Sequence, residues 1–234
     1  MRASATPPSG FLSVDLHVHT VYSKDSLTSL DQMVASVERA DLSAVAITDH
    51  NQIDGALRLR DRAPFPVIIG EEIKTSEGEI TGLFLRERIP PRLSPEETIA
   101  AIRAQGGIVY LPHPVDAVRT STILPAALER VIQQVDAVEV INARVMSASR
   151  NTEARRLAER YGLAQGAGSD AHTPAEVGTA YVLVPRCDLT DASSFLAALA
   201  EGRPMGGLSS PLVHLASTWA KIRKRLPGSN PPQS

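Results

Sequence analysis

The sequence predicts an α/β fold in which short buried strands alternate with amphipathic helices. Eight short apolar runs recur along the chain, and segments with helix-start signals stand between them. Strands that are apolar on successive residues are covered on both faces, which is typical of parallel sheets. Parallel strands joined by helices form a barrel or a doubly wound sheet. With 234 residues, 43% of them hydrophobic, the chain can bury one large core, and we expect a single domain over residues 11–226.

The two ends of the chain differ in composition from this domain. Residues 1–10 and 227–234 are rich in proline, serine and glycine, so we expect flexible tails. The first residues lack the apolar segment of a secretory signal, and no run of eighteen apolar residues is present. These features predict a cytoplasmic protein with no membrane partner.

The strands and helices can be assigned in chain order. The apolar runs predict strands at 11–14, 44–47, 67–69, 80–85, 108–111, 137–141, 163–167 and 181–184. Thr28 with Asp31 predicts a capping box for the first helix, and Ser94 with Glu97 predicts one for a later helix that has Pro95 at its first position. Further helices are expected over 54–62, 147–161, 190–201 and 212–226, whereas Gly202 and 206–207 are interpreted as turns.

Five of the six histidines come just after a predicted strand, and acidic residues accompany them. Because the carboxyl ends of parallel strands meet at one rim, these side chains should converge there. Carboxylates brought this close repel one another unless a cation lies between them. The residues are His17, His19, Asp25, Asp49, His50, Glu71, Glu72, His113, Asp170 and His172.

The mixture of imidazole and carboxylate is typical of sites for zinc, manganese or iron, often with more than one ion. Cys187 is the only cysteine, so any metal must be held by histidine and carboxylate. Residues two apart on a strand point to the same face, so His17 and His19 can aim at one ion. Asp170 and His172 have the same spacing.

These motifs resemble the polymerase and histidinol phosphatase (PHP) superfamily of metallophosphoesterases. The similarity extends from about Val14 to Val184. It is carried by Asp15-Leu16-His17-Val18-His19-Thr20 with Tyr22-Ser23 and Asp25, then Thr48-Asp49-His50-Asn51, Gly70-Glu71-Glu72-Ile73, Leu111-Pro112-His113-Pro114 and Ser169-Asp170-Ala171-His172.

The resemblance implies a distorted seven-stranded (β/α) TIM-like barrel with two or three divalent ions at the carboxyl ends of the strands. It implies that Glu72 bridges the first ion to a second that His113 also binds; Glu71 is the less favoured neighbour. The implied ligands of the first ion are His17, His19, Glu72 and Asp170, and those of the third are Asp25, His50 and His172.

One position departs from the family pattern. Many members have a histidine on the strand after the bridging glutamate, and residues 78–83 contain none. Either Glu79 replaces it or the second ion has fewer protein ligands. A carboxylate there would shift the preference toward manganese or magnesium.

A metal site of this kind activates water for attack on a phosphoester, so the predicted activity is a phosphoesterase acting on a small molecule or nucleotide. Arginine is suited to hold the outer phosphate oxygens, and Arg119 and Arg144 lie near the expected rim. Asp25, His172 or a water on the metal can protonate the leaving group.

Two alternative functions fit the sequence less well. An exonuclease acting on short oligonucleotides needs a basic groove and stacking aromatics, and the chain has a net charge of −2 and only 4% aromatic residues. We therefore expect no stable nucleic-acid complex. A non-catalytic regulatory domain would have lost ligands, and nearly all are retained. The basic run 221–225 is explained by the helix dipole, on a helix whose apolar stripe, including Leu215, Trp219 and Ile222, is expected to be buried.

Overall fold

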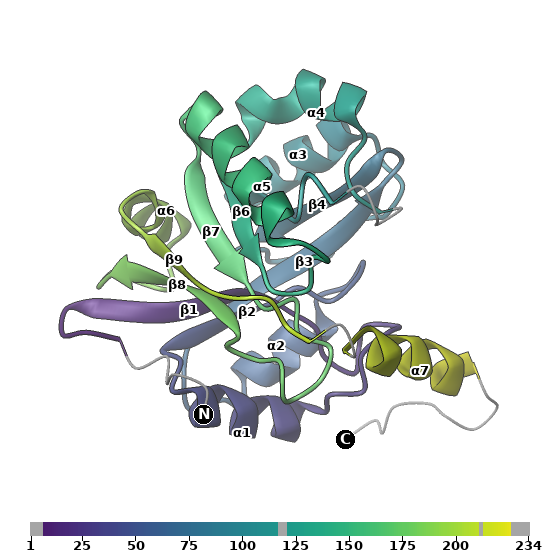
Figure 1. Cartoon of the computed structure of the whole chain (residues 1–234), viewed down its shortest axis with the longest axis vertical. Coiled ribbons are helices and arrows are strands. Elements are labelled where there is room, and N and C mark those ends of the chain that lie inside the picture. The colour runs from purple at the N-terminus through teal and green to yellow at the C-terminus, as the bar shows by residue number, and fades with distance from the viewer. Residues whose placement is uncertain (1–6, 117–120, 211–212, 226–234) are drawn as a thin grey trace.

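A nine-stranded sheet curls into a nearly closed barrel (Figure 1). The computed structural model describes residues 7–116, 121–210 and 213–225. The strands are β1 (Phe11–Val18), β2 (Ala44–Ile47), β3 (Val67–Thr75), β4 (Gly78–Leu83), β5 (Ile108–Leu111), β6 (Ala137–Asn142), β7 (Ala164–Gly168), β8 (Ala180–Pro185) and β9 (Arg203–Gly206). They pair in the order β7-β6-β5-β4-β3-β2-β1-β8-β9.

The α/β class is confirmed, but the expected count of seven strands is wrong. Parallel pairing is found between β1 and β2, β2 and β3, β5 and β6, and β6 and β7. In contrast, β4 and β8 run antiparallel to both of their neighbours, and β9 is antiparallel to β8. Only Ser76 and Glu77 separate β3 from β4, which is too short for a parallel crossover. The segment around Gly206, interpreted as a turn, extends the sheet as β9.

The reversal of β4 changes which of its ends faces the rim. Thr75, the last residue of β3, pairs with Gly78, the first residue of β4. The amino end of β4 therefore lies beside the carboxyl end of β3. Glu79, the second residue of β4, reaches the same rim as the residues that follow the parallel strands.

The barrel is closed by a seam between β1 and β7 that has few hydrogen bonds. Asp170 N donates to His17 O at 2.7 Å, and His19 N donates to Ala171 O at 2.9 Å. The two strands approach closely at Gly168, where a Cβ atom would lie 2.3 Å from the Cβ of His17. Only glycine fits there without moving β1.

Helices cover the outside of the barrel (Figure 1). They are α1 (Leu30–Ala40), α2 (Asp54–Arg60), α3 (Pro95–Ala104), α4 (Pro125–Val131), the 3-10 helix η1 (Ile132–Gln134), α5 (Ala148–Tyr161), α6 (Ala192–Ala200) and α7 (Val213–Arg225). The predicted capping box of α3 is confirmed at Ser94 and Glu97. In α1 the capping residue is Ser29, because the hydroxyl of Thr28 donates to His172 O instead.

The barrel interior is apolar at the end away from the histidines. Leu16 and Tyr110 belong to a buried cluster that also contains Phe195 and Leu199 of α6. The cluster includes Ala44, Ile108 and Ala137, which begin β2, β5 and β6. Helix α6 therefore seals the amino-terminal end of the parallel strands and leaves their carboxyl ends for polar side chains.

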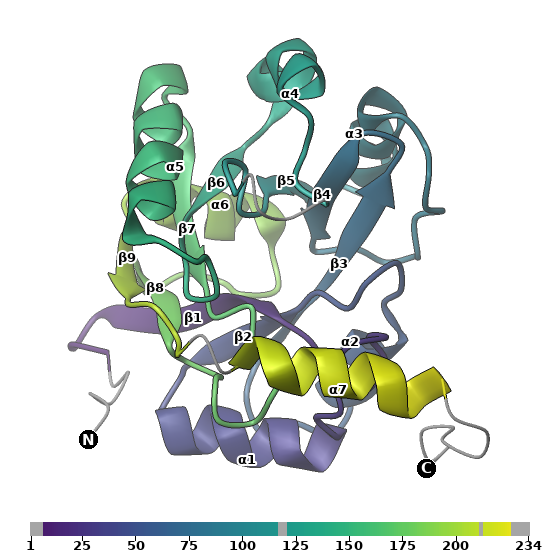
Figure 2. The same ribbon diagram turned by 45° about the vertical axis from the view of Figure 1, so that its right-hand side comes forward.

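Helix α7 forms as predicted, but the expected burial of its apolar stripe is wrong. Leu215, Trp219 and Ile222 are 67%, 57% and 50% exposed. The buried positions are Ser217 and Ala220, on the other face. Figure 2 shows α7 as a separate yellow helix in front of β2 and α2. Polar contacts with Arg144 and with the loop after β1 hold its inner face, so the apolar stripe is left outside.

The predicted tails coincide largely with residues that the structure does not describe. Of the ranges 1–10 and 227–234, only 7–10 are described, and they lead into β1. Among the helices of the described residues, none has the length and apolar character needed to cross a membrane.

Candidate metal centre

The predicted metal ligands gather at one rim of the barrel. Glu72 lies within β3, whereas the others follow a strand or lie near a strand end; all are buried except His50, which is partly exposed. They are His17 and His19 at the end of β1, Asp25 in the next loop, His50 after β2, Glu72 in β3, Glu79 in β4, His113 after β5, and Asp170 and His172 after β7.

A first group forms around the His-x-His segment. The Nε2 atoms of His17 and His19 lie 3.1 Å apart, because residues two apart on the extended chain face the same way. Glu72 Oε2 is 3.4 Å from each of these nitrogens. Asp170 Oδ1 is 3.8 Å from the first and 3.5 Å from the second. These four side chains form the set implied for a first ion.

A second group shares Glu72. Its Oε1 atom lies 3.0 Å from His113 Nε2, while its Oε2 atom lies 3.1 Å from His50 Nδ1. Glu79 approaches the same nitrogens, with Oε2 at 4.0 Å from His113 Nε2 and Oε1 at 3.9 Å from His50 Nδ1. The strand reversal thus places a carboxylate where the family pattern has a histidine.

A third group lies toward the mouth of the barrel. Asp25 Oδ1 is 3.4 Å from His172 Nε2, and Asp25 Oδ2 is 3.3 Å from His50 Nε2. A lysine that was not predicted, Lys221 of α7, comes within 3.4 Å of the same Oδ2 atom.

The outer partners of the histidines leave their inner nitrogens free to bind a cation. The Nδ1–H of His17 donates to the Glu139 carboxylate at 3.0 Å. The Nδ1–H of His19 donates to Ser23 Oγ at 3.0 Å, and that of His172 to a backbone carbonyl at 2.8 Å. In its neutral form each of these rings therefore presents its Nε2 lone pair toward carboxylate oxygens. Imidazole nitrogens and carboxylate oxygens that face one another as acceptors are suited to bind a divalent cation between them.

The charges within the rim shift its groups in different directions. Burial opposes protonation of His17 and His50, but the neighbouring carboxylates raise the pKa of His17 well above its usual range and that of His50 to about 9, so a cation would have to displace protons from these two rings. Burial, together with the charges of His172 and His50, lowers the pKa of His19 to about 3. Burial opposes ionisation of Glu72, but the charges of His17 and His50 hold its pKa well below its usual range. At neutral pH His19 is thus neutral and Glu72 is anionic, as metal coordination requires.

Glu139 of β6 supports the site from behind and was not predicted. It is fully buried. Its Oε1 atom accepts from His17, while its Oε2 atom accepts from His113 N at 2.8 Å and from Asn142 Nδ2 at 3.0 Å. A carboxylate that orients a metal-binding histidine fixes the ring and raises its basicity.

Glu139→Gln is expected to weaken metal binding by about 10- to 100-fold, the usual effect of losing such a support. An amide has one acceptor oxygen, so it cannot serve all three donors, and its NH₂ group must face one of them. Affinity is measured by competition with a chromogenic chelator, with the exposed Glu159→Gln as control. Equal affinity in both variants would show that Glu139 has no such role.

Glu71 and Glu72 point in different directions. Glu71 Oε2 accepts from Ile89 N at 2.8 Å, away from the histidines. Burial raises the pKa of Glu71 to about 7. Of the two carboxylates, that of Glu72 is therefore the one that faces the histidines of the rim.

Glu71→Gln is expected to gain stability relative to the wild type as the pH rises. The unfolded carboxyl ionises near pH 4.5, whereas the folded one keeps its proton to about pH 7. Wild-type stability therefore falls across this window, and glutamine avoids the loss. We expect a relative gain of about 1–3 kcal/mol between pH 5 and pH 8, measured by denaturant unfolding. A stability difference that does not change with pH would refute this account.

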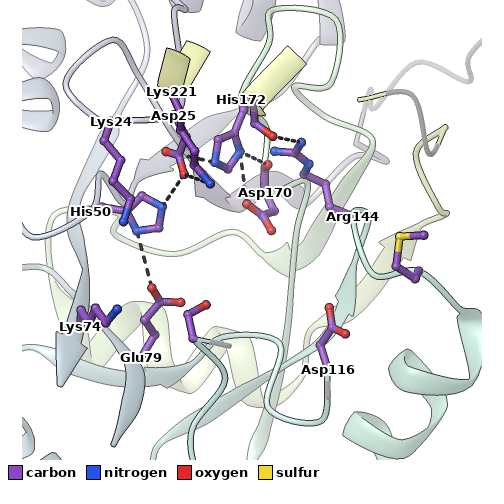
Figure 3. Close-up of a pocket in the computed structure, with 13 residues that line it drawn as sticks. Lys24, Asp25, His50, Lys74, Glu79, Asp116, Arg144, Asp170, His172 and Lys221 are labelled. Atoms are coloured by element: carbon purple, nitrogen blue, oxygen red, sulfur yellow. Dashed lines mark hydrogen bonds and ion pairs between the residues drawn. The ribbon is translucent and has the colours of Figure 1, made fainter. Parts of the chain in front are cut away.

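The rim opens into a cavity of about 480 Å³, whose lining combines four carboxylates, those of Asp25, Glu79, Asp116 and Asp170, with a cationic border. Three lysines that were not predicted, Lys24, Lys74 and Lys221, line it together with Arg144 (Figure 3). Such a border suits an anionic substrate. The other predicted arginine, Arg119, lies outside the described residues.

Arg144 is buried and its guanidinium is engaged with protein groups. Nη2 donates to Val213 O at 2.9 Å and to Ser217 Oγ at 3.0 Å. Nε lies 3.3 Å from Glu176 Oε1. The predicted substrate-binding arginine thus lines the cavity while it also holds α7 against the barrel.

The residues that sequence reasoning missed had weak signals. Glu139 is the one charged residue of a largely apolar strand, Ala137–Asn142, which can indicate a buried functional carboxylate. Lys221 belongs to the basic run 221–225, and the preference of cations for a helix C-terminus was a sufficient explanation for that run. Its place at the site follows from the packing of α7, which the sequence pattern did not indicate.

Comparisons with known proteins bear on this arrangement. A family model described as PHP domain matches residues 15–111, and one described as PHP-associated matches residues 148–204. Two relatives are uncharacterized proteins of Methanocaldococcus jannaschii. MJ0417 is 38% identical over 174 residues, covering 73% of this chain and 70% of the relative. MJ1587 is 41% identical over 146 residues, covering 56% of this chain and 82% of the relative.

Solved structures resemble the fold at lower identity. One is a two-domain protein from Bacteroides vulgatus containing a predicted PHP-like metal-dependent phosphoesterase, with a TM-score of 0.71, 18% identity, and coverage of 94% of this chain and 74% of that one. Another is PsfC from Pseudomonas syringae, with a TM-score of 0.67, 20% identity, and coverage of 91% and 98%. At these identities the likeness concerns the fold alone.

Proposed function

Because this chain belongs to the PHP domain family, we propose that it is a metal-dependent phosphoesterase that hydrolyses a small phosphorylated molecule or nucleotide. One observation carries the proposal: imidazole lone pairs and carboxylate oxygens converge at the barrel rim, inside a cavity bordered by lysines. The first feature suits divalent cations and the second suits an anionic ligand.

We assign the ligands by their proximity to one another. His17, His19, Glu72 and Asp170 would hold one ion. Glu72 would also serve a second ion, with His113 and Glu79, and the remaining group is Asp25, His50 and His172. Zinc, manganese, iron or magnesium are compatible with these nitrogen and oxygen ligands. When bound, such ions supply a nucleophilic hydroxide near neutral pH and neutralise charge on the phosphoryl oxygens.

The chain's own residues would orient the substrate and move a proton. Asp25 and His172 lie 3.4 Å apart at the mouth of the site, on the side open to the cavity. We propose that one of this pair protonates the leaving oxygen. The cationic border would hold the phosphate oxygens away from the carboxylates of the rim.

The size and lining of the cavity favour small substrates. Among the described residues, no phenylalanine, tyrosine or tryptophan lines it, so a chain of nucleotide bases lacks the usual stacking platform there. An exonuclease acting on short oligonucleotides is therefore the second candidate rather than the first.

The test is a metal analysis of the purified full chain, followed by a substrate screen. Phosphomonoesters, nucleotides and short oligonucleotides are assayed with manganese, zinc, iron and magnesium. We expect bound metal and release of phosphate from a phosphomonoester. Faster cleavage of oligonucleotides would favour the second candidate. Absence of bound metal, with no hydrolysis after addition of manganese or zinc, would overturn the proposal.

A further inference from the structure

Helix α7 packs with the polarity opposite to that of most surface helices. Such helices bury an apolar stripe and expose polar residues. Here Leu215, Trp219 and Ile222 face outward, while Ser217 and Ala220 are buried. Burial of the apolar stripe therefore does not hold the helix in this orientation.

Polar contacts at two points fix α7 to the site. Near its start, Arg144 Nη2 donates to Val213 O and to Ser217 Oγ. Near its end, the ammonium group of Lys224 donates to Val21 O and Ser23 O. The second anchor lies in the loop that follows β1 and carries Asp25. The helix is thus attached to the metal-binding rim itself.

Lys221 lies between these anchors on the same helix face, four residues after Ser217 and three before Lys224. Its Nζ atom is 3.4 Å from Asp25 Oδ2, and its side chain is 46% exposed and lines the cavity. Figure 3 shows it beside Asp25. An ion pair with so exposed a lysine contributes little to folding. Stability therefore does not account for the position of this residue.

We propose that Lys221 is a substrate-binding residue that contacts the phosphoryl group, and that Arg144 is a positioning residue that docks α7. The inference rests on the proposed function and deepens it. Arg144 uses Nη2 twice within α7 and directs Nε toward Glu176. Within the described part of the chain, Lys221 makes no such hydrogen bond to a backbone carbonyl, and its side chain reaches the mouth of the site.

The test compares Lys221→Met and Lys221→Arg with Arg223→Met, which removes an exposed charge from the same helix. Inorganic phosphate binding to the metal-loaded full chain is measured by calorimetry, alongside KM and kcat for a phosphomonoester and the metal content. We expect Lys221→Met to weaken phosphate binding and raise KM by about 10- to 100-fold. Lys221→Arg should restore part of the binding. Arg223→Met should bind like the wild type, and metal content should be unchanged throughout.

The positioning role of Arg144 has its own readout. Trp219, the only tryptophan of the chain, lies two residues from Lys221 and reports on α7. Arg144→Met is expected to change its fluorescence emission and to weaken phosphate binding, whereas Lys221→Met should leave the emission unchanged. Unchanged emission in Arg144→Met would overturn the docking role.

The outcomes separate this inference from the proposed function. If the wild type hydrolyses the phosphomonoester and Lys221→Met matches it in KM and phosphate binding, the role of Lys221 is wrong and the proposed function stands. If the wild type binds neither metal nor phosphate, both are overturned. Loss of metal from Lys221→Met would also contradict the inference, since the residue would then act on the metal site.

Discussion

Glu72→Gln is expected to remove most of the hydrolytic activity, lowering kcat/KM by about 10²–10³-fold, the range seen when a group that stabilises transition-state charge is lost. Glu72 is the residue shared by the groups at the rim. Its Oε1 atom faces His113, and its Oε2 atom lies within 3.4 Å of both His17 and His19. Glutamine keeps the shape but loses the charge, and its NH₂ group cannot bind a cation.

The measurement is kcat/KM together with the number of metal ions bound per chain. Glu71→Gln is the matched control, since it makes the same chemical change at the neighbouring residue, whose side chain faces Ile89. We expect the control to keep full activity. Normal turnover in Glu72→Gln would refute the bridging role, and loss of activity only in Glu71→Gln would reassign it.

Removing metal is expected to lower the thermal stability of the chain substantially. Asp25, Glu72, Glu79 and Asp170 are buried carboxylates at one rim, and bound cations would relieve their mutual repulsion. Free metal at about 1,000 times its Kd stabilises a folded protein by about 4 kcal/mol. For a chain of this size, each kcal/mol shifts Tm by about 2–4 °C, so we expect a fall of about 8–16 °C.

Calorimetry or circular dichroism of the full chain, before and after treatment with a chelator, measures this shift. Adding the metal back should restore the original Tm. The shift should be smaller in Glu72→Gln, because that variant lacks the shared ligand. An unchanged Tm after complete removal of the metal would show that these carboxylates are not stabilised by cations.

Much of the rim could be anticipated because its signals are local. His17 and His19 are two apart on a strand, and the other ligands follow apolar runs whose ends meet in any parallel α/β fold. The choice of Glu72 over Glu71 came from the family pattern, and the alternation of side chains in β3 places the two carboxylates on different faces.

The remainder depends on tertiary packing, which periodicity does not report. β4 is reversed because two residues cannot form a crossover, and this brings Glu79 to the rim. Lys221 reaches the cavity because α7 packs by its polar face. The apolar stripe of this helix had predicted that the opposite face would be buried. The supporting role of Glu139 could not be predicted, because it depends on which strand lies behind His17.

Because the first metal group lies at the seam between β1 and β7, an ion bound there would also have a structural role. These strands are distant in sequence, and they meet through few hydrogen bonds rather than a full ladder. His17 and His19 lie on one side of the seam and Asp170 on the other. An ion held by all three would act as a clasp that closes a loop of some 150 residues, as a disulfide does in secreted proteins, in a chain whose single cysteine cannot form an internal one.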